Sequence, residues 1–145
     1  MAKLKLDLGE LTSEFFEDAR LLGIVAPVKD YLLCWHLNNR LRFHFRNNND
    51  IEIQLTKKKR AYFFSVYHCE EPHSALHHYL YKNHFDGEYL LPEFRHLDYL
   101  WLMKGDVVGP DALQGLIQSI KTLNGVQLVT ELTNEKIKNK GNLVF

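Results

Sequence analysis

The sequence IEIQLTKKKRAYFFSVYHC, residues 51–69, predicts two β-strands joined by a tight basic turn. Residues 51–55 alternate apolar and polar side chains, and residues 59–68 are rich in aromatic and β-branched side chains, as strands are. The run from Lys57 to Arg60 falls where a hairpin turn is expected. An antiparallel hairpin is therefore predicted in the middle of the chain.

Further strands are predicted on both sides of this hairpin. Residues 75–82 alternate, although Leu76, Tyr79 and Leu80 also fit helical spacing, and we interpret them as a strand. The cluster NNND at residues 47–50 is interpreted as a turn. The other predicted strands are residues 4–6, 21–25, 88–91, 97–105 and 126–129.

Two amphipathic helices complete the predicted fold. The first covers residues 28–41 approximately, after Pro27, and the second starts at Gly109-Pro110-Asp111 and stops at Asn124-Gly125. The sequence therefore predicts a single α+β domain over residues 1–145, with a mainly antiparallel sheet of about six strands and the two helices packed on one face. The order of elements is like an elaborated ferredoxin-like arrangement.

Composition is that of an ordinary folded domain. The chain has 145 residues, 46% of them hydrophobic, and equal numbers of acidic and basic side chains. The first residues carry charges throughout, where a secretion signal would need an apolar run, and no later stretch could span a membrane. Cys34 and Cys69 lack metal-ligand spacing. We expect a cytoplasmic protein with both thiols reduced.

The segment Leu91-Pro92-Glu93-Phe94-Arg95-His96-Leu97-Asp98-Tyr99 carries the most distinctive pattern in the chain. It resembles the motif that names the IPExxxVDY family of bacterial proteins, with Leu91 in place of Ile and Leu97 in place of Val. The layout of the whole chain is also similar to that family, from Lys29-Asp30-Tyr31 to the terminal Asn142-Leu143-Val144-Phe145. The resemblance implies a fold and a cytoplasmic location, but no catalytic residue can be carried over.

Two interpretations of this segment are open. In the first, Pro92, Glu93, Asp98 and Tyr99 form a structural corner, in which the carboxylates accept hydrogen bonds from the main chain at a strand junction. In the second, Glu93 and Asp98 are a carboxylate pair for acid–base or metal chemistry, which requires both side chains to converge in a pocket. We predict the structural role and assign no catalytic residue.

The eight histidines suggest a metal site without establishing one. His73, His77 and His78 follow Cys69 and two glutamates, a ligand set that suits zinc, yet adjacent His77 and His78 point to opposite faces of a strand. No phosphate-binding loop or nucleophile motif is present. The sequence favours a non-catalytic protein with no cofactor and no metal. The alternative of an enzyme with a site at Glu93, Asp98 or the His73/His77 cluster stays open.

Aromatic side chains occur on both faces of the predicted sheet. Two helices cover one face well, so the other face is expected to meet a partner, and tyrosine suits an interface. We predict a homodimer, with a protein partner as a further candidate, through the residues Tyr62, Phe64, Tyr79 and Tyr81. The open alternative is that the chain's own N-terminal or C-terminal segment covers this face.

A nucleic-acid-binding domain is the alternative function. The same aromatic face could stack bases while basic loops contact phosphates. The zero net charge of the chain weighs against this function. The basic side chains concerned are Arg40, Arg42, Arg46, Lys57, Lys58, Lys59 and Arg60.

Overall fold

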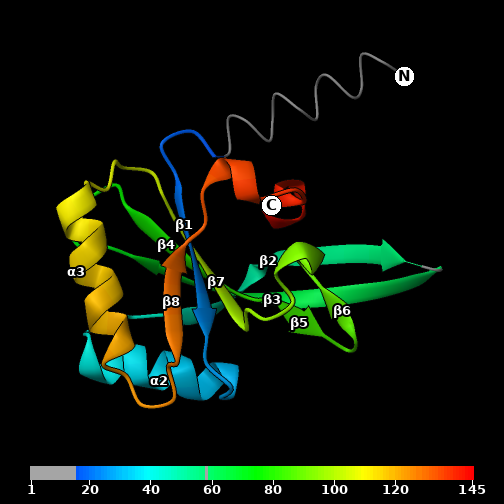
Figure 1. The fold of residues 1–145 in the computed structure, drawn as a ribbon, viewed down its shortest axis with the longest axis horizontal. Helices are drawn as coiled ribbons and strands as arrows, with labels where there is room; N and C mark the ends of the chain where they lie inside the picture. Colours follow the sequence, from blue (N-terminus) through cyan, green and yellow to red (C-terminus); the bar gives the residue numbers. More distant parts are fainter. Residues whose placement is uncertain (1–15, 58) are drawn as a thin grey trace.

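The computed structural model describes residues 16–57 and 59–145, which form a six-stranded antiparallel sheet, a two-stranded sheet and two α-helices (Figure 1). In chain order the elements are β1 (Arg20–Val25), α2 (Asp30–Arg40), β2 (Arg46–Lys57), β3 (Arg60–Glu70), β4 (His77–Lys82), β5 (His84–Phe85), β6 (Glu88–Tyr89), β7 (Tyr99–Lys104), α3 (Pro110–Lys121) and β8 (Leu128–Glu131). Three short 3-10 turns are η1 (Pro92–Phe94), η2 (Asn134–Lys136) and η3 (Lys140–Leu143).

The large sheet has the strand order β2-β3-β4-β7-β1-β8, and every neighbouring pair in it is antiparallel. The helix α2 connects β1 to β2 at the far edge, and α3 connects β7 to β8. The strands β8, β1, β7 and β4 with the two helices follow the expected ferredoxin-like order, to which the β2–β3 hairpin is added. The predicted α+β class with a mainly antiparallel sheet is confirmed.

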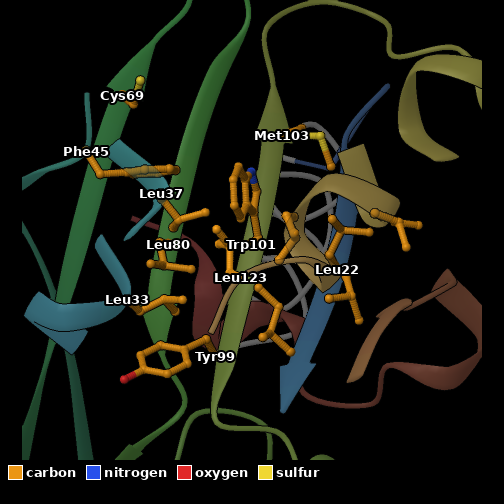
Figure 2. Close-up of a cluster of buried hydrophobic side chains, with 14 of the residues drawn as sticks. Leu22, Leu33, Leu37, Phe45, Cys69, Leu80, Tyr99, Trp101, Met103 and Leu123 are labelled. Atoms are coloured by element: carbon orange, nitrogen blue, oxygen red, sulfur yellow. The ribbon is translucent and has the colours of Figure 1, made fainter. Parts of the chain in front are cut away.

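Both helices pack on the same face of the sheet, as predicted. One buried cluster joins Leu33 and Leu37 of α2 and Ile117 of α3 to the sheet. Trp101 of β7 is fully buried among these side chains (Figure 2). Fully burying one leucine or isoleucine contributes about 1.5–3 kcal/mol, so this face supplies much of the stability.

The second face of the sheet is covered by the chain's own C-terminal part and by the segment that precedes β7. A second buried cluster contains Phe64, Tyr81 and Leu102 from the strands. Its covering side chains are Leu90, Leu91, Leu97, Leu132, Ile137 and Leu143. The molecule therefore has two cores, one on each side of the sheet, and the open alternative that the chain's own C-terminal segment covers this face is the one that holds.

Three local predictions differ from the structure or fall outside it. Residues 47–50 were expected to form a turn but lie within β2, where the β2–β3 register shifts between Asn47 and Glu52. The extra residues of a bulge accommodate polar, turn-forming side chains within a strand. The predicted strand 88–91 is shorter, since β6 ends at Tyr89. The predicted strand at residues 4–6 lies outside the described residues.

None of the helices in the described part of the chain is both long enough and apolar enough to span a membrane.

Candidate functional site

Glu93 holds the C-terminal segment in place. Its Oε2 accepts hydrogen bonds from the main-chain N–H groups of Lys138 at 2.6 Å and Asn139 at 2.7 Å, and its Oε1 accepts one from Nδ2 of Asn139 at 2.8 Å. Pro92 opens the turn η1 and so places Glu93 at this position. These contacts join residues far apart in the sequence and give the carboxylate a positioning role in the fold.

Asp98 and Tyr99 hold a different segment. Asp98 Oδ2 accepts a hydrogen bond from the main-chain N–H of Ala26 at 2.8 Å, and the Tyr99 hydroxyl donates to the carbonyl of Val28. Both contacts fix the link between β1 and α2. Glu93 and Asp98 therefore bind separate parts of the main chain, and their contacts support the structural interpretation over a catalytic carboxylate pair.

The protonation of Glu93 should affect stability in acid. Burial alone would raise the pKa of Glu93, but the hydrogen bonds from the Asn139 side chain and from main-chain N–H groups outweigh it and lower the pKa below 4.5. A lowered folded pKa stabilises the protein above the unfolded pKa, and this contribution is lost as the pH falls through the folded pKa. We expect Glu93→Gln to remove that part of the acid dependence.

The measurement is chemical unfolding at several pH values between neutral and about pH 3. The wild-type protein should lose stability more steeply in acid than Glu93→Gln, whereas Glu17→Gln, at an exposed turn residue, should follow the wild type. Parallel curves for wild type and Glu93→Gln would show that the hydrogen bonds of Glu93 do not stabilise its ionised form.

Asn83 is a buried hub that sequence reasoning missed. Its side chain has no exposed surface. Its Nδ2 donates to the carbonyls of Phe94 at 3.0 Å and Leu97 at 2.9 Å, and its Oδ1 accepts from the N–H of Leu91 at 2.9 Å. One side chain thus satisfies three main-chain groups of the motif segment. Asn83 heads a turn-like sequence, which gave no signal that it would be buried.

The predicted aromatic interface lies mostly inside the folded chain. Phe64, Tyr79 and Tyr81 are only 1%, 8% and 0% exposed. The Tyr81 hydroxyl donates to the carbonyl of Leu143 at 2.9 Å, and the Tyr79 ring lies 4.8 Å from that of Phe145. Tyr62 is half-buried, with the Arg60 guanidinium over its ring. The C-terminal segment covers this face, so these residues do not form an exposed surface for a partner.

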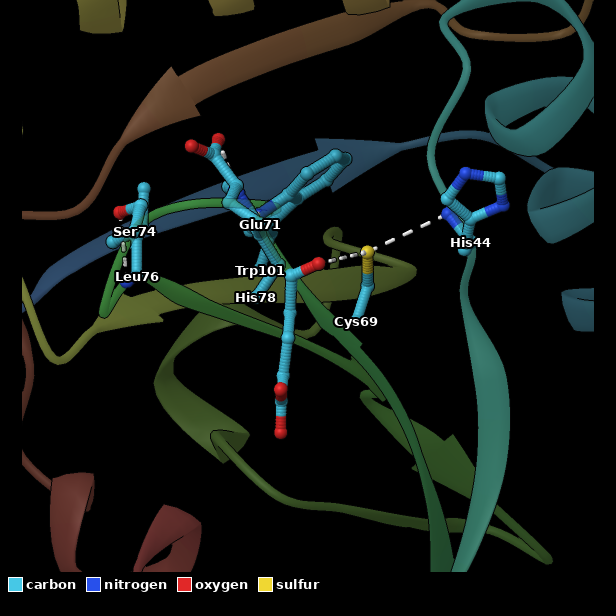
Figure 3. A network of polar contacts seen from close by, with 8 residues as sticks. His44, Cys69, Glu71, Ser74, Leu76, His78 and Trp101 are labelled. Carbon is cyan, nitrogen blue, oxygen red and sulfur yellow. Dashed lines mark hydrogen bonds and ion pairs between the residues drawn. The ribbon is translucent and has the colours of Figure 1, made fainter.

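His78 is buried on the helix face in a polar network (Figure 3). Trp101 Nε1 donates to His78 Nδ1 at 2.9 Å, and His78 Nε2 lies 3.0 Å from Glu71 Oε1. Because the indole nitrogen can only donate, Nδ1 must be the acceptor and Nε2 carries the proton. Burial lowers the pKa of His78, although the Glu71 carboxylate raises it. Both ring nitrogens are used, so His78 is a structural histidine.

His77 points to the opposite face, where it meets Glu70, which the sequence had grouped with it, and His68, which the sequence had not. His68 Nε2 lies 2.8 Å from His77 Nδ1, and Glu70 Oε1 lies 3.9 Å from the same nitrogen. In the described part of the chain, these three side chains form the group that could hold a metal ion. His73, the expected partner of His77, is exposed in the turn before β4 and does not belong to this group.

The basic residues around the β2–β3 hairpin are partly neutralised. Arg60 forms an ion pair with Asp86, and Lys57 Nζ lies 3.3 Å from Glu88 Oε2. Asp86 lies in the turn between β5 and β6, and Glu88 lies in β6. Both the pairing of these cations and the burial of the aromatic face remove support for the nucleic-acid alternative.

The outer face of α2 is the most apolar exposed surface found on a helix in the described residues. Tyr31, Leu32 and Trp35 are 67%, 39% and 55% exposed, while Leu33 and Leu37 on the inner side are fully buried. We call Tyr31, Leu32 and Trp35 the α2 outer face. The inner stripe of the helix packs on the core, whereas Tyr31, Leu32 and Trp35 on the other side have no covering element among the described residues.

The α2 outer face is held on a rigid base. The Asp30 carboxylate accepts a hydrogen bond from the hydroxyl of Tyr67 in β3 at 2.8 Å, which joins the first turn of the helix to the sheet. At the other end, Asn38 exchanges two hydrogen bonds with the main chain of Phe45. The helical spacing of Leu33 and Leu37 predicted the buried stripe of α2, and no pattern in the sequence identified the exposed side.

Comparison of the chain with protein-family models, curated proteins and solved structures finds no match to any of them.

Proposed function

We propose that the chain is a non-catalytic interaction module that forms a homodimer through the α2 outer face. The observation that carries this proposal is the exposure of Tyr31, Leu32 and Trp35 on one side of a helix whose other side is buried. Tryptophan and tyrosine are the side chains most enriched among residues that dominate binding energy at interfaces. Monomeric proteins rarely leave such residues together in water.

A second copy of the chain suits this surface. Trp35 lies midway along the 11-residue helix, with Asp30 in the first turn and Arg40 in the last. An antiparallel pairing about Trp35 brings the exposed rings of the two copies together and opposes the two helix dipoles. Such a pairing is a twofold rotation, which is the commonest symmetry of homodimers.

A charge at the centre of the α2 outer face should abolish the dimer. Trp35→Glu removes the largest contact side chain and would require an unpaired carboxylate to be buried between the copies. We expect the dimer dissociation constant to rise at least about 30-fold. Sedimentation equilibrium over a range of protein concentrations measures it.

Phe63→Glu provides the matched control, because Phe63 is 44% exposed and lies on β3 rather than on α2. This variant should keep the wild-type dissociation constant. A wild-type protein that stays monomeric at about 100 μM, or an equal loss of affinity in both variants, would contradict the proposed dimer.

The remaining proposals follow from the sequence. Membership of the IPExxxVDY family is proposed from residues 91–99, and it brings no activity with it. A cytoplasmic location is supported by two free cysteines that are both buried in the fold.

A further inference from the structure

Two antiparallel strands bring three metal-ligand side chains together on the face opposite the helices. In the β3–β4 ladder, Glu70 lies directly opposite His77, and His68 lies opposite Tyr79. His68 and Glu70 are two residues apart on one strand, so their side chains share a face with that of His77. The donor atoms of all three side chains lie within 4.8 Å of one another.

We propose that His68, Glu70 and His77 bind a divalent transition-metal ion, with zinc as the ion that best fits the ligand set. Two imidazole nitrogens and one carboxylate oxygen are ligands that Zn²⁺ takes in proteins. A site with three protein ligands leaves the fourth position to water or a small anion. This inference is independent of the proposed dimer, because it concerns the sheet face and not α2.

The distances are close to those that a bound ion requires. Ligand atoms about 2.0–2.1 Å from one tetrahedral zinc lie roughly 3.3 Å from each other. His68 Nε2 and His77 Nδ1 are 2.8 Å apart, and His77 Nδ1 is 3.9 Å from Glu70 Oε1. Side-chain movements of about 1 Å, without a change of the backbone, would therefore form the site.

The surroundings hold the histidines but leave the carboxylate adjustable. The His68 ring stacks on the ring of Tyr79 at 4.7 Å with an angle of 11° between the planes, and Tyr79 is itself buried. The Glu70 side chain is 69% exposed and can turn toward an ion. A pre-oriented pair of imidazoles reduces the entropy that binding must overcome.

Charges around the site set the expected affinity. Glu70 supplies one negative charge, while Lys104 lies opposite His77 in the β4–β7 ladder and opposes a cation. One carboxylate and one neighbouring lysine favour an affinity in the micromolar range rather than that of a closed structural zinc site.

Isothermal titration of the full chain, prepared without a histidine tag, with zinc chloride at neutral pH tests the inference. We expect one equivalent to bind with a dissociation constant of about 1–50 μM. His68→Ala and His77→Ala should each weaken binding at least about 10-fold, and His73→Ala is the matched control that should bind as the wild type does. The visible absorption of Co²⁺ in the same proteins should show nitrogen coordination that both ligand variants lose.

Glu70→Gln keeps the test decisive if a histidine variant fails to fold. The Glu70 side chain is exposed, so the substitution should leave the fold intact. It should raise the dissociation constant for zinc about 10-fold. A wild-type protein whose dissociation constant for zinc exceeds about 100 μM would overturn the inference. Unchanged affinity in all three ligand variants, or a loss confined to His73→Ala, would overturn it equally.

Discussion

Replacement of Asn83 by leucine should lower the free energy of unfolding by about 3 kcal/mol or more. Leucine fills a similar volume but leaves the carbonyl of Leu97 and the N–H of Leu91 without the partner they have in Asn83, and the carbonyl of Phe94 keeps only its bond from the N–H of Leu97. Each buried main-chain group left unsatisfied costs about 1–3 kcal/mol. Urea unfolding monitored by circular dichroism measures the change.

Asn39→Ala is the control for this substitution. Asn39 is exposed on α2, and its amide donates to the carbonyl of Trp35 at the surface. Its loss should change stability by no more than about 0.5 kcal/mol. A comparably small effect of Asn83→Leu would show that water or a local rearrangement satisfies the motif segment without the Asn83 amide.

Replacement of Leu143 by alanine should lower the free energy of unfolding by about 2–5 kcal/mol, because Leu143 is fully buried against the second face of the sheet. The cavity would open directly beside Tyr81, whose hydroxyl bonds to the carbonyl of Leu143. Thermal and urea unfolding measure this loss of stability. The control variant Lys136→Ala, at an exposed position, should unfold as the wild type does.

The same variant examines whether the C-terminal segment belongs to the fold. A loss below about 1 kcal/mol would mean that residues 137–145 contribute little to the second core. In that case Tyr79 and Tyr81 would be accessible for part of the time, and the sheet-face interface predicted from the sequence would regain its basis.

The sheet was predictable because its pattern is local. Alternation along residues 51–55 identified β2, the aromatic and β-branched residues 59–68 identified β3, and the apolar residues 97–105 identified the central strand β7. Residues 75–82 fitted both helical and strand periodicity. The cross-strand pairing of β4 with β3 and β7 decides for the strand, since it buries Leu80 and Tyr81 on opposite faces.

The contacts of the second face were not predictable from one sequence. Glu93 binds Lys138 and Asn139, more than 40 residues away along the chain. No local periodicity encodes such a pairing, because the entropic cost of closing a loop of that length is similar for many other possible partners of Glu93. The strands do carry aromatic side chains on this face, as the sequence indicated, but the C-terminal segment buries them.

The partners of His77 were also not predictable from the sequence, although they lie on neighbouring strands. The sequence grouped His73 and Glu70 with His77, yet the register of β3 against β4 brings His68 and Glu70 to His77 and leaves His73 out. A shift of one residue in that register would move His68 to the other face. Register depends on the whole sheet, so the ligand set could be assigned only from the structure.

The most direct test of the proposed dimer measures the distance between two copies of α2. Lys29 is exposed just before the helix and lies six residues from Trp35. A nitroxide label on Lys29→Cys can be placed selectively, because Cys34 and Cys69 are buried and burial raises the pKa of Cys34 to about 12. Double electron–electron resonance then reports the distance between labels.

Antiparallel pairing about Trp35 separates the two labelled positions by about 18 Å along the helices and by 8–10 Å, approximately, across them. With the length of the label arms, the account predicts an intermolecular distance of about 20–35 Å that disappears in the Trp35→Glu background. A distance distribution with nothing below about 50 Å in the labelled wild-type background, or one that Trp35→Glu leaves unchanged, would contradict self-association through the α2 outer face.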